Sequence, residues 1–303
     1  MKILFTKANM RINQFIMLSL LFVFSTHSTI LMAEVGDNFT QGNFKFTVMS
    51  EKGDQGTVSV AAASDAISGT LNIPLFVRNK TVCYKVTSIA DEAFFKCSKL
   101  TGNLVIPTGI TRIGSLAFSN CNNLDGILIL PKTLKVIDGY AFNECSSLSG
   151  TLTLPESLNF IGEGAFQNCS GLTDSLFIPR SVRHIGNLAF NGCCGLNGTL
   201  VISEGVESVG QYAFAGCSGL MGVRLPNTMT IVDNGLFSGC TGLTGTLVIP
   251  NSVKSIGYRA FSDCYNIQSV IMPKTECSIR YNSFDNCHEL ITKLLDFKGI
   301  SSL

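Results

Sequence analysis

The sequence predicts a solenoid, in which short repeated segments coil and stack on one another around a parallel β-sheet. Phenylalanine recurs every 23 or 24 residues from Phe94 to Phe284. Each of these phenylalanines is followed three residues later by cysteine and six residues later by leucine or isoleucine. Each copy then enters a short alternating apolar stretch that usually ends at proline. One repeat cannot bury its own apolar face, whereas stacked copies cover one another.

The repeated phenylalanine and cysteine are expected to form two columns in the interior of the stack. Each buried phenylalanine ring should stabilise the fold by about 2–3 kcal/mol. An aliphatic residue five positions before each phenylalanine forms a third column. The phenylalanines are Phe94, Phe118, Phe142, Phe166, Phe190, Phe214, Phe237, Phe261 and Phe284. The cysteines are Cys97, Cys121, Cys145, Cys169, Cys193, Cys217, Cys240, Cys264 and Cys287.

The alternating stretches, such as LVIP at Leu104–Pro107 and LTLP at Leu152–Pro155, predict one short strand per repeat. Proline lacks a ladder donor and marks the end of each strand, and only Ser203 breaks this proline column. The segment between proline and cysteine leaves room for a single helical or 3₁₀ turn. A repeat of this length with closely spaced leucines is typical of leucine-rich repeats. We therefore expect about nine to ten repeats of 23–24 residues that share one parallel β-sheet.

The repeat pattern LxIPxxVxxIGxxAFxxCxxLxG, seen as LFIPRSVRHIGNLAFNGCCGLNG, resembles the BspA-type leucine-rich repeats. The resemblance extends from residue 71 to about residue 297. It implies a secreted or surface protein of the kind found in Bacteroidetes and some protozoa. It also implies a binding role, because some members of this family are adhesins for extracellular-matrix or host proteins. The family has no shared catalytic residues.

Residues 1–33 are expected to be a signal peptide for export. Three basic residues and no acidic ones precede or flank the apolar run at 15–24, and ten apolar residues are too few to span a bilayer. Cleavage after Ala33 is expected, and an uncleaved interfacial anchor is the alternative. Because no cysteine precedes Cys83, we expect no lipoprotein anchor. No later run predicts a membrane helix, so the mature chain should have no integral membrane segment.

The ends of the repeat array differ from its centre. Residues 34–70 contain two alternating stretches joined by EKGDQG, which predicts a β-hairpin that caps the first repeat. We place the array of repeats at 71–303. Its first repeat carries extra residues including RNKTVCY, which should form a loop or small hairpin. Residues 291–303 should add one more strand. The edge at this C-terminal end is a candidate for self-association.

Neither the charge nor the cysteines indicate nucleic-acid binding, a metal site or catalysis. Charged residues make up only 14% of the chain and the formal net charge is +1, so nothing favours DNA or RNA as a partner. Nine of the twelve cysteines occupy one column of parallel side chains, which favours buried free thiols over disulfides. His184 and His288 are expected on the surface. We find no catalytic, metal-binding or cofactor-binding constellation and predict that the protein is not an enzyme.

The middle residue of each LxI strand should point outward and line up with its neighbours. Most of these residues are large and apolar, which predicts an apolar strip of the kind that marks interaction surfaces. Their β-propensity alone is the alternative explanation. The residues that follow the prolines are mostly polar, and they resemble the rim of an interface. The candidate ligand-binding residues are Val105, Ile129, Thr153, Phe177, Val201, Arg224, Val248 and Ile271.

These observations predict a secreted or cell-surface binding protein that recognises a protein or another extended ligand through the exposed face of the sheet. A host or extracellular-matrix protein is the partner that the resemblance implies. The alternative function is a self-associating structural element of a surface assembly. An enzyme is the third possibility, and the sequence contains no motif that favours it.

Overall fold

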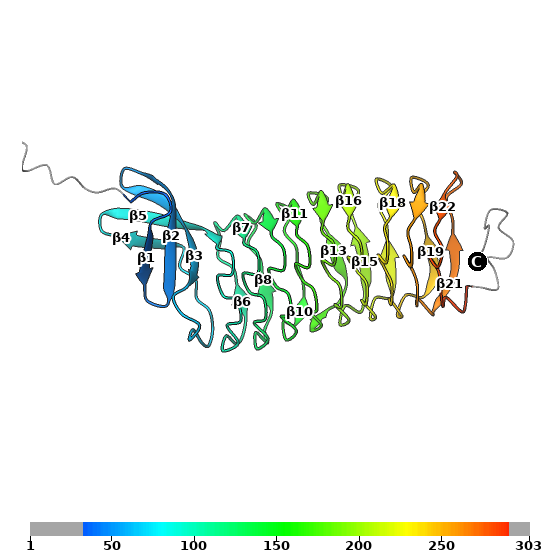
Figure 1. Ribbon diagram of the computed structural model, residues 1–303, viewed down its shortest axis with the longest axis horizontal. Helices are drawn as coiled ribbons and strands as arrows, with labels where there is room; N and C mark the ends of the chain where they lie inside the picture. Colours follow the sequence, from blue (N-terminus) through cyan, green and yellow to red (C-terminus); the bar gives the residue numbers. More distant parts are fainter. Residues whose placement is uncertain (1–32, 291–303) are drawn as a thin grey trace, which may run out of the picture. The chain divides into compact units, whose positions relative to one another are not determined.

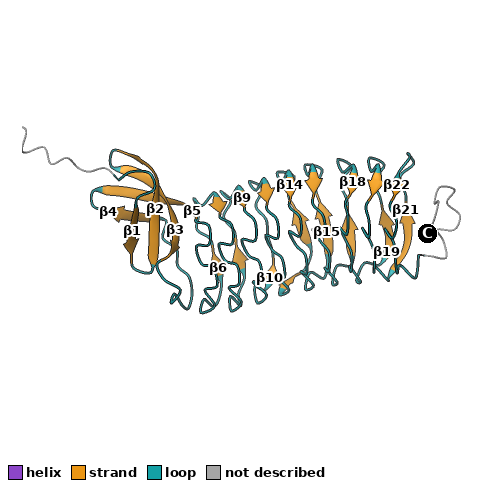
Figure 2. Ribbon diagram, in the orientation of Figure 1, coloured by secondary structure: helices purple, strands orange, loops and turns teal. Residues whose placement is uncertain are grey.

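The computed structural model describes residues 33–290 and shows a stack of coils that begins with a small antiparallel sheet (Figure 1). The described residues from Val35 onward belong to one compact unit. The expected signal peptide and the expected last strand lie outside the described residues. None of the described residues is helical, and the coils consist of short strands and turns (Figure 2). The predicted leucine-rich-repeat solenoid is confirmed.

The first part of this unit is formed by five strands. The strands are β1 (Asn38–Gln41), β2 (Phe44–Lys52), β3 (Gln55–Ala62), β4 (Phe76–Asn79) and β5 (Val82–Ile89). Strands β1, β2 and β3 pair antiparallel, and β3 then pairs in parallel with β5. The extra residues of the first repeat form the antiparallel hairpin β4–β5, as expected. Because β5 also pairs in parallel with β7 (Arg112–Ile113) of the coils, the antiparallel strands join the stack through backbone hydrogen bonds.

Each coil contributes at least two short strands instead of the single strand that we expected. One set, which we call the isoleucine row, ends at the aliphatic residue five positions before each phenylalanine. It comprises β7 (Arg112–Ile113), β9 (Val136–Ile137), β11 (Phe160–Ile161), β14 (His184–Ile185), β16 (Ser208–Val209), β18 (Ile231–Val232), β20 (Ser255–Ile256) and β22 (Ser278–Ile279). These strands pair in parallel, with an interruption between β16 and β18.

The predicted LxI strands belong to a second set, which we call the leucine row. It comprises β6 (Leu104–Val105), β8 (Leu128–Ile129), β10 (Gly150–Thr151), β12 (Leu172–Thr173), β13 (Leu176–Ile178), β15 (Thr199–Ile202), β17 (Gly222–Arg224), β19 (Gly245–Val248) and β21 (Ile267–Ile271). Its hydrogen-bonded groups are β6–β8, β10–β12, β13–β15–β17 and β19–β21. The expectation of one sheet is therefore corrected to two rows of parallel strands, both of which are interrupted.

Hydrogen-bonded turns replace the expected helical or 3₁₀ turn around the AFxxC motif. In one coil the Cys121 amide donates to the Phe118 carbonyl at 3.1 Å, which is a tight turn within the coil. The Phe118 amide instead donates to the Ala141 carbonyl of the next coil at 2.7 Å. Leu116 and Asn120 have φ angles of 56° and 62°, and this left-handed conformation is found in β-turns, whereas every residue of a 3₁₀ helix has a negative φ.

The phenylalanine column forms a continuous stack through the interior, as predicted. Consecutive rings from Phe94 to Phe284 lie 5.0–5.8 Å apart between centroids, with interplanar angles of 3–14°. All but the last of these rings are fully buried. At the N-terminal end, Phe44 of β2 makes an edge contact with Phe94 at 6.5 Å. The aromatic core therefore runs from the antiparallel strands into the coils.

The thiols of the cysteine column donate to buried backbone carbonyls, most of which also accept from the backbone amide of the cysteine in their own coil. From Cys121 onward, each thiol of the column donates to the carbonyl of the phenylalanine in the preceding coil, at 3.0–3.2 Å. All twelve cysteines are free, which confirms the expectation of buried thiols in the column. Burial raises the pKa of the Cys121 and Cys217 thiols to about 12. The column is thus protonated at neutral pH and acts as a set of small hydrogen-bond donors.

Candidate ligand-binding surface

The candidate surface is formed by the outward side chains of the leucine row together with Thr153, which lies at the same level in the unpaired segment 152–154, and we call these side chains the outer row. Alternation along each strand places Leu104 and Ile106 in the core and leaves Val105 between them 46% exposed. Phe177 is likewise 50% exposed, whereas Val201 is half-buried. The whole outer row points outward, as predicted, and comprises Val105, Ile129, Thr153, Phe177, Val201, Arg224, Val248 and Ile271.

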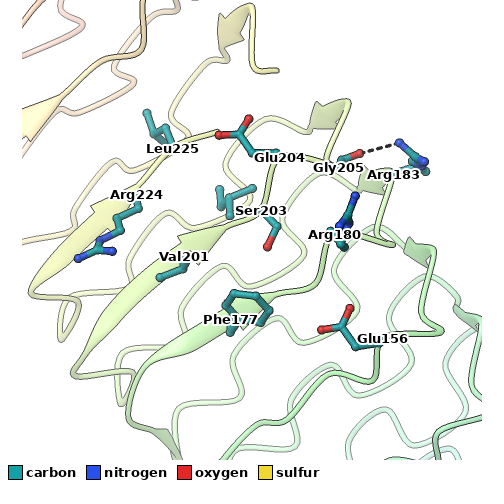
Figure 3. Close-up of a pocket in the computed structure, with 11 residues that line it drawn as sticks. Glu156, Phe177, Arg180, Arg183, Val201, Ser203, Glu204, Gly205, Arg224 and Leu225 are labelled. Atoms are coloured by element: carbon teal, nitrogen blue, oxygen red, sulfur yellow. Dashed lines mark hydrogen bonds between the residues drawn. The ribbon is translucent and has the colours of Figure 1, made fainter. Parts of the chain in front are cut away.

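Strand register aligns members of the outer row in neighbouring coils. Val105 pairs with Ile129, and Val248 pairs with Ile271. Figure 3 shows the central part, where Phe177, Val201 and Arg224 lie on the paired strands β13, β15 and β17. A row of side chains with one member per coil therefore crosses the strands. Apolar members outnumber polar ones, which agrees with the predicted strip.

The row is interrupted at Thr153, where the structure forms a depression. No strand pairing includes residues 152–154, although the coils on both sides contribute strands to the leucine row at this level. Thr153 is small, and it lies between the larger Ile129 and Phe177. The resulting depression has a volume of about 900 Å³, and Ile127, Ile129, Thr151, Thr153 and Phe177 contribute to its lining. Sequence reasoning did not identify Ile127 or Thr151, which are also exposed.

A second depression of about 830 Å³ lies on the other side of Phe177 (Figure 3). Phe177, Val201, Arg180, Arg183 and Arg224 contribute to its lining. Phe177 lines both depressions and is therefore the ridge between them. The arginines around this ridge give the depression cationic groups beside an apolar floor, an arrangement that suits a ligand with both apolar and acidic groups.

The charged residues at these depressions differ in how they are paired. Arg183 donates from Nη1 to the Gly205 carbonyl at 3.2 Å and lies 3.3 Å from a Glu207 carboxylate oxygen. Glu204 accepts hydrogen bonds from the backbone amide and the side-chain amide of Asn227, at 2.8 and 2.9 Å. Arg180 takes part in none of the ion pairs found within residues 33–290. Its guanidinium is thus available to an external carboxylate.

The repeat departs from its own pattern around the second depression. Ser203 stands where other coils have proline, and its amide donates to the Ile178 carbonyl at 3.3 Å, a bond that proline cannot make. Two residues later, Gly205 stands where other coils carry residues such as Ser157. A Cβ atom at Gly205 would lie only 1.7 Å from the Arg180 carbonyl oxygen, so this close approach requires glycine. Gly109 also breaks this Ser/Thr column, so only the combination of Ser203 with Gly205 sets this coil apart in the sequence.

The structure places the other candidate chemical groups apart from one another. Cys194 is the one exposed cysteine of the described chain, and the column thiols are buried. His184 is exposed, with Nδ1 2.8 Å from the Ser208 hydroxyl, and His288 stacks on Tyr265 at 5.7 Å.

Within residues 33–290, no group of three or more histidine, cysteine or acidic side chains is arranged to hold a metal. Over the same range, the structure contains no helix long and apolar enough to cross a bilayer.

Stacked coils with an interior leucine column and an outward row of side chains define the chain as a leucine-rich-repeat protein. The family model for the BspA type leucine rich repeat region matches residues 77–197 and 194–295. The chain therefore belongs to the BspA-type leucine-rich repeat family.

Solved structures of bacterial repeat proteins resemble the chain in fold. A leucine-rich repeat protein of Treponema pallidum is 23% identical, with 84% of this chain and 94% of that chain covered and a TM-score of 0.46. A leucine-rich cell surface protein of Faecalibacterium prausnitzii is 18% identical, with 86% and 94% covered and a TM-score of 0.40. The pneumococcal vaccine antigen PcpA is 19% identical, with 83% and 87% covered and a TM-score of 0.40. No curated relative matches the sequence.

Proposed function

We propose that this protein is an exported binding protein, secreted or held at the cell surface, that recognises a protein or another extended ligand through the outer row. The observation that carries the proposal is the row of exposed apolar side chains on a rigid stack of coils, bordered by polar residues. Free apolar surface of this kind marks interaction sites. Membership of the BspA-type family supports a binding role, and a catalytic role has no support from the described side chains.

Export is the second part of the proposal and rests on the apolar, basic N-terminal segment. We expect the secreted or surface fraction to contain a chain that begins at Glu34. Intact-mass measurement of the protein recovered from that fraction tests this expectation. A chain that retains residues 1–33 would show that the segment is not removed.

The role of the outer row is tested by replacing Val105, Ile129, Phe177 and Val201 with serine or threonine. The wild-type protein and the variant would be used to capture proteins from extracellular-matrix and host-surface preparations. We expect the variant to lose the captured ligand while its circular dichroism and thermal unfolding stay unchanged. A matched control replaces Phe160 and Ile231, which are exposed on the isoleucine row, and should keep binding. Unchanged capture by the outer-row variant would reject the proposal.

A further inference from the structure

A row of charged residues borders the outer row, and its charges alternate from coil to coil. We call it the rim row, and its central members are Lys132, Glu156, Arg180 and Glu204, each the first residue after the proline position. All four are exposed. They line the same two depressions as Phe177, so they flank the outer row. None of them takes part in an ion pair within the described chain.

Along the stack, the charges of the rim row run positive, negative, positive, negative. When a second copy of the row is laid against the first in the opposite direction, each acidic residue lies opposite a basic one. Two copies packed face to face achieve this reversal if a two-fold axis lies between them, parallel to the strands and between Glu156 and Arg180. Glu156 of each copy then meets Arg180 of the other, and Lys132 meets Glu204.

The sizes of the outer-row side chains favour the same axis. In the outer row this axis passes between Thr153 and Phe177, so the exposed Phe177 ring of one copy stands over Thr153 of the other. Thr153 lies in the depression of about 900 Å³, which can receive a ring. One coil further out, Ile129 meets Val201, and both are apolar. The charges of the rim row and the side-chain sizes of the outer row thus favour the same two-fold axis, and the two observations come from different residues.

The spacing of the coils favours a second copy over an extended peptide as the occupant. Successive coils are about 5 Å apart, as the ring separations of 5.0–5.8 Å show. Alternate side chains of an extended peptide recur at about 6.8 Å and fall out of register with the coils. A second copy has the same spacing and stays in register across all the central coils.

We propose that the open face of this protein binds a second copy of the chain, with the two stacks antiparallel about this two-fold axis. The inference rests on the proposed function, because it takes the outer row as a binding surface and names its partner. Four central coils give a contact about 20 Å long, which is typical of a weak, reversible dimer. Self-recognition of this kind would allow exported copies to link to one another.

The test measures the oligomeric state of the purified full chain by sedimentation velocity and light scattering, from low micromolar to the highest soluble concentration. All variants carry Cys194→Ser and are kept in reducing buffer, so that a disulfide cannot link two chains. We expect a concentration-dependent dimer. Arg180→Glu should raise the dissociation constant at least tenfold, because two opposed Arg–Glu pairs become Glu–Glu pairs. The double variant Glu156→Arg/Arg180→Glu should restore the dissociation constant to within about threefold of the parent.

Lys274→Glu is the matched control, because it makes a charge change in the same rim row at a coil that the overlap does not reach. It should leave the dissociation constant unchanged. Thermal unfolding checks that each variant folds, and Lys132→Glu replaces Arg180→Glu if that variant does not. A strict monomer at every concentration overturns the proposal, and so does a dimer that Arg180→Glu leaves intact or that the double variant fails to restore. A monomer would leave the proposed binding of other ligands standing, because the capture experiment with the outer-row variant tests that proposal separately.

Discussion

The interior of the coils and their open face follow opposite rules, although the same short segments build both. In the interior, the same side chain returns in every coil, and each one contacts its own copies above and below. On the open face, the outer row changes from Ile129 to Thr153 to Phe177 in three successive coils, and each side chain faces solvent. The interior therefore carries the stability of the stack, and the side chains of the open face are not constrained by the stacking.

This comparison predicts that equal chemical changes have unequal effects on the two sides. The predictions below run from changes that should unfold the whole stack to changes that should affect single exposed side chains. Each pairs an interior position with an exposed one where the chain offers both.

The largest expected effect is loss of stability in alkaline solution. Burial raises the pKa of the column thiols, with Cys121 and Cys217 at about 12, whereas an unfolded thiol has a pKa near 8.5. The folded state therefore holds its thiol protons longer, so this contribution is complete below pH 8.5 and is lost as the pH rises toward 12. Each column thiol that is ionised in the unfolded state but protonated in the folded state lowers the free energy of unfolding by about 1.4 kcal/mol per pH unit in this window.

With a whole column of such thiols, the stack should unfold cooperatively above about pH 9 under reducing conditions. Urea unfolding followed by circular dichroism between pH 7 and 11 measures the slope. Replacing Cys169 with alanine should reduce the slope by about 1.4 kcal/mol per pH unit, because burial raises the pKa of its thiol in the folded state. A free energy of unfolding that stays constant up to pH 11 would show that the column does not stay protonated in the folded state.

The next effect compares two phenylalanines that lie 11 residues apart in the chain, less than half a repeat. Phe166→Ala removes a fully buried ring that stacks on Phe142 at 5.1 Å and on Phe190 at 5.2 Å. It should cost about 3–5 kcal/mol of unfolding free energy and divide the stack into two less coupled halves. Phe177→Ala removes a half-exposed ring and should change stability by less than about 1 kcal/mol. Urea unfolding of both variants is the measurement, and similar losses would contradict the distinction between interior and open face.

A smaller effect is expected where the interior and the open face meet, at the second depression. Gly205→Ala places a methyl group against the Arg180 carbonyl, so the backbone must shift, at a cost of about 1–3 kcal/mol. In the same region, a Cβ atom at Gly222 would come no closer than 3.6 Å to its neighbours. Gly222→Ala should therefore be neutral or stabilising by up to about 1 kcal/mol. If thermal unfolding gives the two variants the same midpoint, the close approach at Gly205 is not maintained in solution.

The sequence was most informative where the packing is most repetitive. A residue type that returns in every coil, such as Phe166 or Cys169, can only be a buried column, and both columns were predicted. The isoleucine row was missed because strands such as Val136–Ile137 are two residues long, too short for an alternation to be recognised. Its strands form because neighbouring coils satisfy their backbone groups, which no local pattern records.

The candidate surface was predicted in orientation but not in shape. Alternation along each strand gave the outward direction of the outer row, because burial of the flanking leucine and isoleucine leaves only one direction. The depression at Thr153 depends on a missing strand pairing between coils, and the close approach at Gly205 depends on the position of a carbonyl in the preceding coil. Both arise from contacts between coils, whereas the sequence periodicity describes only what each coil has in common.

The smallest expected effect concerns thiol reactivity and leaves the fold intact. A brief treatment of the native protein with iodoacetamide should modify Cys194 first, because this thiol is exposed and the adjacent Cys193 is fully buried. Cys83 and Cys277 are partly exposed and should follow more slowly, while the column should stay unmodified until urea unfolds the stack. Peptide mass spectrometry distinguishes these sites. Modification of Cys193 at the rate of Cys194 would mean that the coils open readily, and that the interior does not separate from the open face as the structure indicates.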